Sequence, residues 1–357
     1  MADPKAAAGT RPAAASPPSG LPRWLRGLLR QILSVTVTLL GLMALAFFIG
    51  RMLPLDPVIA IVGEQAEKET YDMVWRQLGL DRPLWQQFVY FIRDMLSGDF
   101  GNALFTGNRV ADDLKRVFPA TIELATFAIT IGVGIGVPIG VLAAVYRGSF
   151  IDHATRFIGL LGYSSPTFWL GLMGLIVFYA ALGWVGGPGR LDVMYLDMVE
   201  PRTNLILVDS LLAGEPDVFW DAFSHIILPG TILGYSSMAY ISRMTRSFML
   251  EQLGQEYVTA ARVKGQSRWR VVWRHAFRNI LVQLITVIAL AYAFLLEGAV
   301  LTETVFAWPG FGRYLTSGIL AGDMNAVLAC ILIIGGIFVA LNLLSDVLYR
   351  TLDPRTK

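Results

Sequence analysis

The residues best suited to catalysis or metal binding are too few and too scattered in this chain to predict an enzyme. Three histidines, His153, His225 and His275, stand far apart, and a single cysteine, Cys330, lies within an apolar run. A zinc site needs about four such side chains at close spacing, and one cysteine cannot close a disulfide within the chain. We therefore expect no catalytic residue, no metal site and no cofactor in this chain.

Nucleotide hydrolysis and intramembrane proteolysis are also poorly matched. The sequence that comes nearest to a phosphate-binding loop is Lys264-Gly265, which lacks the rest of the G-x-x-x-x-G-K motif. ATP would therefore have to be hydrolysed by another chain. A serine protease within the bilayer would need His225 to activate Ser164 or Ser236. We keep that reaction only as the weakest alternative.

One carboxylate, Glu297, stands directly after an apolar run, 279–296, that is long enough to lie in a membrane. Because burying a charge in hydrocarbon is costly, such a residue faces a cavity or a partner by default. We interpret Glu297 as a translocation-path residue that meets a positive amine; the alternative is that the span ends there and water reaches the carboxylate. Polar residues in other predicted spans either line the same path or form interhelical hydrogen bonds. They are Tyr163, Ser164, Ser165, Ser236, Ser237 and Tyr240.

The segment 243–278 is the most basic part of the chain, with eight Lys and Arg residues and two acidic ones. Residues 250–264 read as one helix, because Leu250, Leu253, Tyr257 and Ala261 recur at helical spacing. Gly265 follows as a C-terminal stop. Two interpretations remain open: a helix that docks in a partner's groove, and a basic helix that lies on anionic lipid.

The elements that would position these residues are membrane helices. The chain of 357 residues is 55% hydrophobic and 16% charged, whereas a soluble domain carries about 25% charged residues. Apolar runs long enough to span about 30 Å of hydrocarbon recur along the chain. We expect about six spans, at 31–50, 124–146, 157–180, 222–242, 279–301 and 324–345.

The positive charges predict the orientation. With the N-terminus inside, the inner segments hold 18 of the 29 Lys and Arg residues, and six spans put both termini in the cytoplasm. The predicted parts are a disordered tail (1–22), a peripheral first transmembrane helix (23–53), a periplasmic cap loop (54–120), a five-span core (121–346) and a cytoplasmic tail (347–357). The segment 243–278 is then a cytoplasmic loop of the core.

Two further patterns concern packing. The outer loop has amphipathic stretches at 65–80 and 83–96, which predict helices of a cap on the outer face. Gly132, Gly136 and Gly140 recur every fourth residue in the second span. Small residues at this spacing let membrane helices pack backbone to backbone, so we expect another helix to pack closely there.

Six stretches in chain order resemble the inner-membrane permeases of ABC importers, in particular the B-type permease of the dipeptide, oligopeptide and nickel family. They are Leu53–Pro57, Gly98–Gly101, Ser165–Gly171, Glu256–Gly265, Thr302–Gly310 and Leu352–Arg355. The fourth is similar to the EAA loop of these permeases and is followed by Trp273–Asn279, as in the peptide branch. Thr259 stands where the general EAA loop has Glu, a departure typical of that branch.

The resemblance implies an all-α integral membrane protein with the type I ABC importer permease fold. It implies that segment 250–265 is a coupling helix docking on an ATPase, with contacts from Glu256, Tyr257, Ala260, Ala261, Arg262 and Gly265. The implied partners are a second homologous permease, two ATPase subunits that bind ATP and Mg, a periplasmic or surface substrate-binding protein and membrane lipid, with no nucleic acid.

The resemblance also implies a bacterial inner-membrane importer of dipeptides or oligopeptides. Nickel chelates, glutathione, opines and oligosaccharides are alternative substrates. A secondary, ion-coupled transporter is the rival class. It would be expected to carry several intramembrane charges or half-molecule repeats, whereas this chain has Glu297 and no visible repeat.

Overall fold

Helices make up nearly all of the chain that the structure describes. The computed structural model describes residues 23–52, 57–63 and 65–352. The predicted tail over 1–22, most of the stretch Leu53–Pro57 and the last five residues lie outside the described part. Within that part no β-strand forms, apart from an isolated bridge between Asn102 and Arg109.

The α-helices follow one another along the chain with short connections. They are α1 (Arg23–Met52), α2 (Pro57–Val62), α3 (Lys68–Gln77), α4 (Leu84–Ser97), α5 (Val110–Val145), α6 (Phe150–Ser164), α7 (Thr167–Gly174), α8 (Ile206–Ala213), α9 (Pro216–Leu253), α10 (Glu256–Val263), α11 (Arg268–Arg270), α12 (Arg278–Val305), α13 (Phe311–Leu320) and α14 (Met324–Leu352). π-helical stretches, Leu175–Ala181 and Val271–Phe277, follow α7 and α11.

Four helical segments of the described chain are long and apolar enough to cross a membrane: Leu29–Gly50, Val110–Val145, Arg268–Glu297 and Met324–Leu343. They agree with the predicted first, second, fifth and sixth spans. As expected, the fifth helix continues past Glu297, to Val305. The α6–α7 pair adds a fifth span if it is counted as one bent span.

The third predicted span does not form one continuous helix over 157–180. The chain bends by 93° between α6 and the helix that begins at Thr167. Ser165 at the bend is extended, with φ −87° and ψ 127°. The cause is Pro166, which has no N–H to donate and which disfavours the helical conformation for the residue before it.

The fourth predicted span, 222–242, lies within α9 but is not among the sufficiently apolar segments. His225, Ser236 and Ser237 interrupt its apolar sequence. α9 packs along α5 and also against α6 and α12. Much of its surface therefore faces protein rather than lipid, so it does not need a continuous apolar sequence.

The predicted glycine stripe forms the closest part of the α5–α9 contact. A Cβ atom built on Gly136 would lie 3.0 Å from the backbone oxygen of Met238, and one on Gly140 would lie 2.6 Å from that of Ser242. No side chain fits at either distance without a shift of α9. The prediction that these glycines serve helix packing is confirmed.

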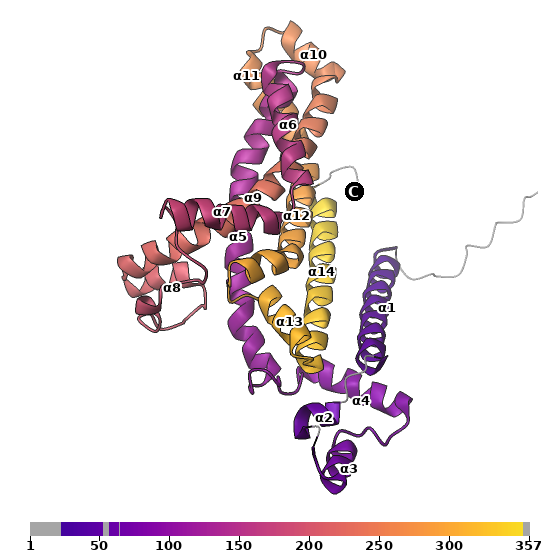
Figure 1. Cartoon of the computed structure of the whole chain (residues 1–357). Coiled ribbons are helices and arrows are strands. Elements are labelled where there is room, and N and C mark those ends of the chain that lie inside the picture. The colour runs from indigo at the N-terminus through magenta and orange to yellow at the C-terminus, as the bar shows by residue number, and fades with distance from the viewer. Residues whose placement is uncertain (1–22, 53–56, 64, 353–357) are drawn as a thin grey trace, which may run out of the picture.

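The predicted cap helices form with slightly different bounds, as α3 and α4, and a third helix, α2, precedes them. Neither α3 nor α4 buries a residue. The cap is attached to α1, where the Phe47 ring packs at a tilt against Phe88 and Phe91 with ring centroids 5.3 and 5.6 Å apart. Figure 1 shows α2, α3 and α4 at the end of the molecule opposite to α10 and α11. That the cap covers an outer mouth remains a prediction.

Candidate coupling helix and translocation path

The predicted coupling segment forms a short helix, α10, that begins later than expected. α9 continues to Leu253, Gly254 ends it, and Gln255 is extended (φ −77°, ψ 151°) before α10 starts. The predicted single helix over 250–264 is therefore wrong, because Gly254 is a weak helix former at the point where the chain turns. Gly265 has φ +75°, which confirms the predicted C-terminal stop.

One face of α10 packs on the rest of the chain. Val258 and Ala261 are buried against Leu253, which ends α9, and Val271, which begins the π-helical stretch. Ala261, predicted as a docking contact, is 6% exposed and faces inward. A direct contact with a partner therefore falls to the other predicted residues of α10.

The face of α10 that does not pack on the chain combines apolar and charged side chains. Val263 is 83% exposed and Tyr257 is 37% exposed. Ala260 is also exposed and adds little bulk between them, while Glu256 and Arg262 supply exposed charges. This face combines a large apolar contact, a small residue and a charged rim, which suits a groove in another protein.

The arm of the loop that follows α10 is tied to the membrane helices. Gln266, just after Gly265, is 2.7 Å from His275 in the π-helical stretch (Oε1 to Nε2). The guanidinium group of Arg268 donates to the backbone oxygen of Val145 at 2.9 Å and lies 4.6 Å from the Tyr146 ring centroid. A cation is favourable at the negative end of helix α5. A displacement of α10 is thus linked directly to α5 and α12.

The predicted path residues of the third span lie at the α6–α7 bend. Ser164 ends α6 and is exposed, and Ser165 is half-buried at the break. Tyr163 is on the last turn of α6, and its side chain lies outside the described part. Broken helices in membranes occur where backbone groups face protein or a water-filled cavity.

Tyr240, from α9, lies elsewhere. Its partly buried ring packs in a cluster with Val137, Leu284 and Val287, between α9, α5 and α12. Arg243 lies over that ring, 5.8 Å from its centroid. The arrangement accounts for Tyr240 as a packing residue at this helix junction.

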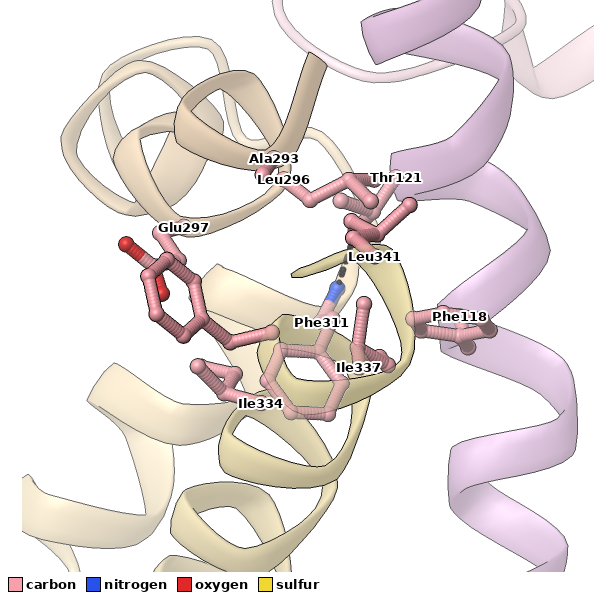
Figure 2. Close-up of a pocket in the computed structure, with 10 residues that line it drawn as sticks. Phe118, Thr121, Ala293, Leu296, Glu297, Phe311, Ile334, Ile337 and Leu341 are labelled. Atoms are coloured by element: carbon pink, nitrogen blue, oxygen red, sulfur yellow. Dashed lines mark hydrogen bonds between the residues drawn. The ribbon is translucent and has the colours of Figure 1, made fainter. Parts of the chain in front are cut away.

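Glu297 lines a small cavity of about 10 Å³, roughly the size of one water, between α12, α13, α14 and α5. In Figure 2 its carboxylate lies across the cavity from Phe118 and Thr121. Neither described cavity joins Glu297 to the predicted residues of the third and fourth spans. Among the described residues, these two cavities therefore do not bring the predicted path residues together at one substrate-sized site.

A fully buried carboxylate, Glu303, lies on the same helix six residues beyond Glu297. Its Oε2 accepts the backbone N–H groups of Gly312 (2.6 Å) and Arg313 (3.0 Å) in the first turn of α13. Its Oε1 accepts the hydroxyl of Thr121 at 2.6 Å. That hydroxyl in turn accepts the N–H of Phe311, the dashed line in Figure 2. Glu303 thus joins α12, α13 and α5.

A second buried charge, Glu123 on α5, anchors the segment between α7 and α9. Arg190 donates two hydrogen bonds to Glu123 Oε2 (2.5 and 3.1 Å) and one to the Asn204 backbone oxygen (2.9 Å). The backbone N–H of Leu207, in α8, donates to Glu123 Oε1 at 2.8 Å. Arg190 also lies 5.8 Å from the Trp308 ring centroid. The hydrogen bonds accepted by Glu303 and Glu123 therefore connect α5 with α12, with α13 and with the segment between α7 and α9.

Sequence reasoning missed both carboxylates. Glu123 directly precedes the apolar run 124–146, and Glu303 lies within the Thr302–Gly310 stretch, so neither position by itself indicates a buried carboxylate. The sequence Pro309-Gly310-Phe311-Gly312 offered a signal that Glu303 has hydrogen-bond donors nearby. It predicts a turn followed by a helix start, whose free N–H groups need an acceptor.

Comparisons with known proteins agree over nearly the whole chain. Residues 136–357 match the family described as "Binding-protein-dependent transport system inner membrane component", and residues 24–125 match the family of its N-terminal part. The probable D,D-dipeptide transport system permease protein DdpB of Escherichia coli (strain K12) is 41% identical over 315 residues, 88% of this chain and 92% of that protein.

Two further matches differ in sequence identity and in the share of the chain that they cover. The dipeptide transport system permease protein DppB of the same strain is 40% identical over 337 residues, 93% of this chain and 99% of that protein. A solved structure of the MetNI methionine ABC transporter in an inward-facing conformation has a TM-score of 0.48 at 18% identity, covering 66% of this chain and 93% of the matched chain.

Proposed function

Because the chain belongs to the family of binding-protein-dependent transport system inner membrane components, we propose that it forms, with partner subunits, the path by which an ATP-driven importer moves peptides across the bacterial inner membrane. The membership confirms the predicted class, an importer permease built of membrane helices, and it gives no support to an ion-coupled carrier. The chain itself is the non-catalytic membrane component.

Di- or oligopeptides are the proposed cargo. The names of the relatives that cover most of this chain refer to D,D-dipeptides and dipeptides. In this proposal a substrate-binding protein delivers the peptide to the end that carries α2–α4, and the peptide leaves at the end that carries α10 (Figure 1). Both chain termini are then cytoplasmic.

The coupling role is carried by one observation: α10 presents exposed apolar side chains while the arm that follows it is tied to membrane helices. An exposed apolar face indicates a partner, and the ties transmit a displacement of α10 to α5 and α12. We assign the partner as an ATPase subunit that binds ATP and Mg, with a second ATPase on a second, homologous permease. Glu256, Tyr257, Ala260, Arg262 and Val263 would make the contact.

Copurification tests the assembly. The chain is tagged at its C-terminus, extracted gently from its own membranes, and its partners are identified by mass spectrometry. We expect a second permease, P-loop ATPases and, with peptide present, a substrate-binding protein. Recovery of this chain alone as a stable homo-oligomer would contradict the proposal.

A matched pair of valines tests the docking face. Val263 on α10 and Val193, between α7 and α8, are 83% and 82% exposed. Val263→Asp places an unpaired charge in the proposed contact, so we expect the ATPase subunits to be lost from the purified complex. Val193→Asp should keep them, and equal ATPase recovery from both variants would place the contact elsewhere.

A further inference from the structure

Three arginines form a stripe along the arm that returns from α10 to the membrane. Arg270, Arg274 and Arg278 follow one another at every fourth position of the continuous helical stretch from α11 to α12, and all three are exposed. Within the described residues no ion pair or hydrogen bond is made by any of their guanidinium groups. Three like charges at this spacing repel one another unless an anion lies against them.

An aromatic stripe runs beside the arginines. Trp269, Trp273 and Phe277 contact one another at tilted angles, with ring centroids 5.3 and 5.0 Å apart, and Trp273 and Phe277 also pack on the core between α5 and α9. Trp269 is 73% exposed. Paired aromatic and basic stripes are typical of a surface at the boundary between hydrocarbon and lipid headgroups, where aromatic rings and guanidinium groups both find partners.

The contacts place the stripe at that boundary. The hydrogen bond from Arg268 to the backbone oxygen of Val145 puts the start of the stripe level with the end of α5. Val145 lies one residue before the end of an apolar run, 124–146, whereas the apolar run of α12 begins only at 279. Residues 269–278 therefore lie at a depth that is apolar on one helix and basic on its neighbour. The anion available at this level of the membrane is a lipid phosphate.

We propose that the stripe of Arg270, Arg274 and Arg278 binds an anionic phospholipid of the leaflet on the α10 side of the membrane. Guanidinium groups pair with phosphate oxygens through two parallel N–H donors, and three such groups along one line fit a headgroup that carries a net negative charge. The adjacent exposed ring of Trp269 lies against the glycerol and the first acyl carbons. Segment 243–278 has eight basic residues and two acidic ones, so its own charge favours this ligand.

The proposal is independent of the docking of α10, because it uses the return arm of the loop rather than the exposed face of the helix. A lipid held there would fix residues 269–278 against the membrane, next to the ties at Gln266 and Arg268. A protein partner on the stripe is the competing occupant, and the experiment separates the two.

The test is native mass spectrometry of the whole purified complex, relipidated with equimolar phosphatidylglycerol and phosphatidylethanolamine. The probe is the ratio of the two lipids that stay bound. Each basic group near an anionic surface contributes about a fivefold preference, so we expect the ratio to fall by at least about 10-fold when Arg270, Arg274 and Arg278 are all changed to Gln. Arg274→Gln alone should reduce the ratio by about fivefold, which keeps the test open if the triple variant fails to fold.

The control removes the same charge at the other end of the molecule. Arg76, Arg93 and Arg109 are exposed, on α3, on α4 and before α5. Their joint change to Gln should leave the lipid ratio of the parent. An unchanged lipid ratio in the stripe variants would overturn the proposal. If the ATPase subunits were lost at the same time, the stripe would be a protein interface instead.

Discussion

Gly140→Ala tests whether the α5–α9 contact depends on the absence of a side chain. A Cβ at this position would lie 2.6 Å from the backbone oxygen of Ser242 and 2.7 Å from the Cβ of Thr245. Real Cβ atoms do not approach other atoms so closely, so α9 has to move as a whole. Overpacking of this kind costs about 1–3 kcal/mol, and the backbone obstacle places Gly140 in the upper half of that range.

The same substitution also removes a poor helix former, which favours the variant by about 0.8–1.0 kcal/mol. Gly134, on the same helix, separates the two effects, because a Cβ there meets nothing within 4 Å. Gly134→Ala should keep only the favourable effect. The two variants should therefore differ in stability by about 2–3 kcal/mol.

The assay is the apparent thermal unfolding midpoint of the purified complex in detergent, followed by tryptophan fluorescence. A difference of 1 kcal/mol shifts the midpoint of a domain of 150–250 residues by about 2–4 °C. We expect Gly140→Ala to unfold at least about 4 °C below Gly134→Ala. Equal midpoints would refute the reasoning, because the close approach would then not limit the contact.

Further predictions concern the coupling helix and the buried carboxylates. Gly265→Val places a β-branched residue at φ +75° and should uncouple ATP hydrolysis from uptake, whereas Gly265→Asn, which tolerates this conformation, should not; equal coupling in both would count against the role of the stop. Glu297→Gln should impair peptide uptake and leave the complex assembled, and Glu69→Gln on α3 is its exposed control; normal uptake would remove Glu297 from the path. Glu303→Ala leaves two buried N–H groups without an acceptor and should destabilise the complex by about 3 kcal/mol or more, against about 1 kcal/mol for Glu303→Gln, which keeps one acceptor; equal midpoints for the two variants would argue against the capping role.

The membrane helices that face lipid could be predicted from the sequence because their side chains all meet the same solvent. Leu29–Gly50 and Met324–Leu343 have a higher mean hydropathy than the other two candidate spans of the described chain, and a run of that kind has one interpretation. The glycine stripe of α5 could be predicted equally well, since spacing alone puts three small residues on one face.

α9 is less apolar than the other long helices for the opposite reason. Its neighbours are protein helices, so polar residues such as Ser237 and Tyr235 bond to backbone oxygens inside the bundle. Ser237 Oγ donates to Gly234 at 2.9 Å, and Tyr235 Oη donates to Ile158 of α6 at 2.7 Å. A mean hydropathy counts such residues as if water surrounded them, so it underestimates how well α9 fits in a membrane.

The start of α10 was misplaced because helical spacing continues across a turn. Leu250 and Leu253 have the spacing of a helix that includes Tyr257, yet they belong to the end of α9. Gly254 was the available signal, and it was outweighed by the apolar pattern on either side. A turn between helices that share a buried face leaves little trace in periodicity, so Ala261 was assigned outward when it packs inward.

The choice between Glu297 and Glu303 shows what local sequence leaves out. The rule that a carboxylate in an apolar run marks function rests on the cost of an unpaired charge, and that cost depends on the donors around it. Thr121, one donor to Glu303, is 182 positions away, and the others are backbone groups of α13. No pattern within α12 could have revealed them. Glu303 is thus a buried charge whose donors stabilise it, and its burial is explained by the junction of α12, α13 and α5. Glu297 is half-buried beside a cavity without this network, so a functional role for it depends on what a second permease brings to that surface.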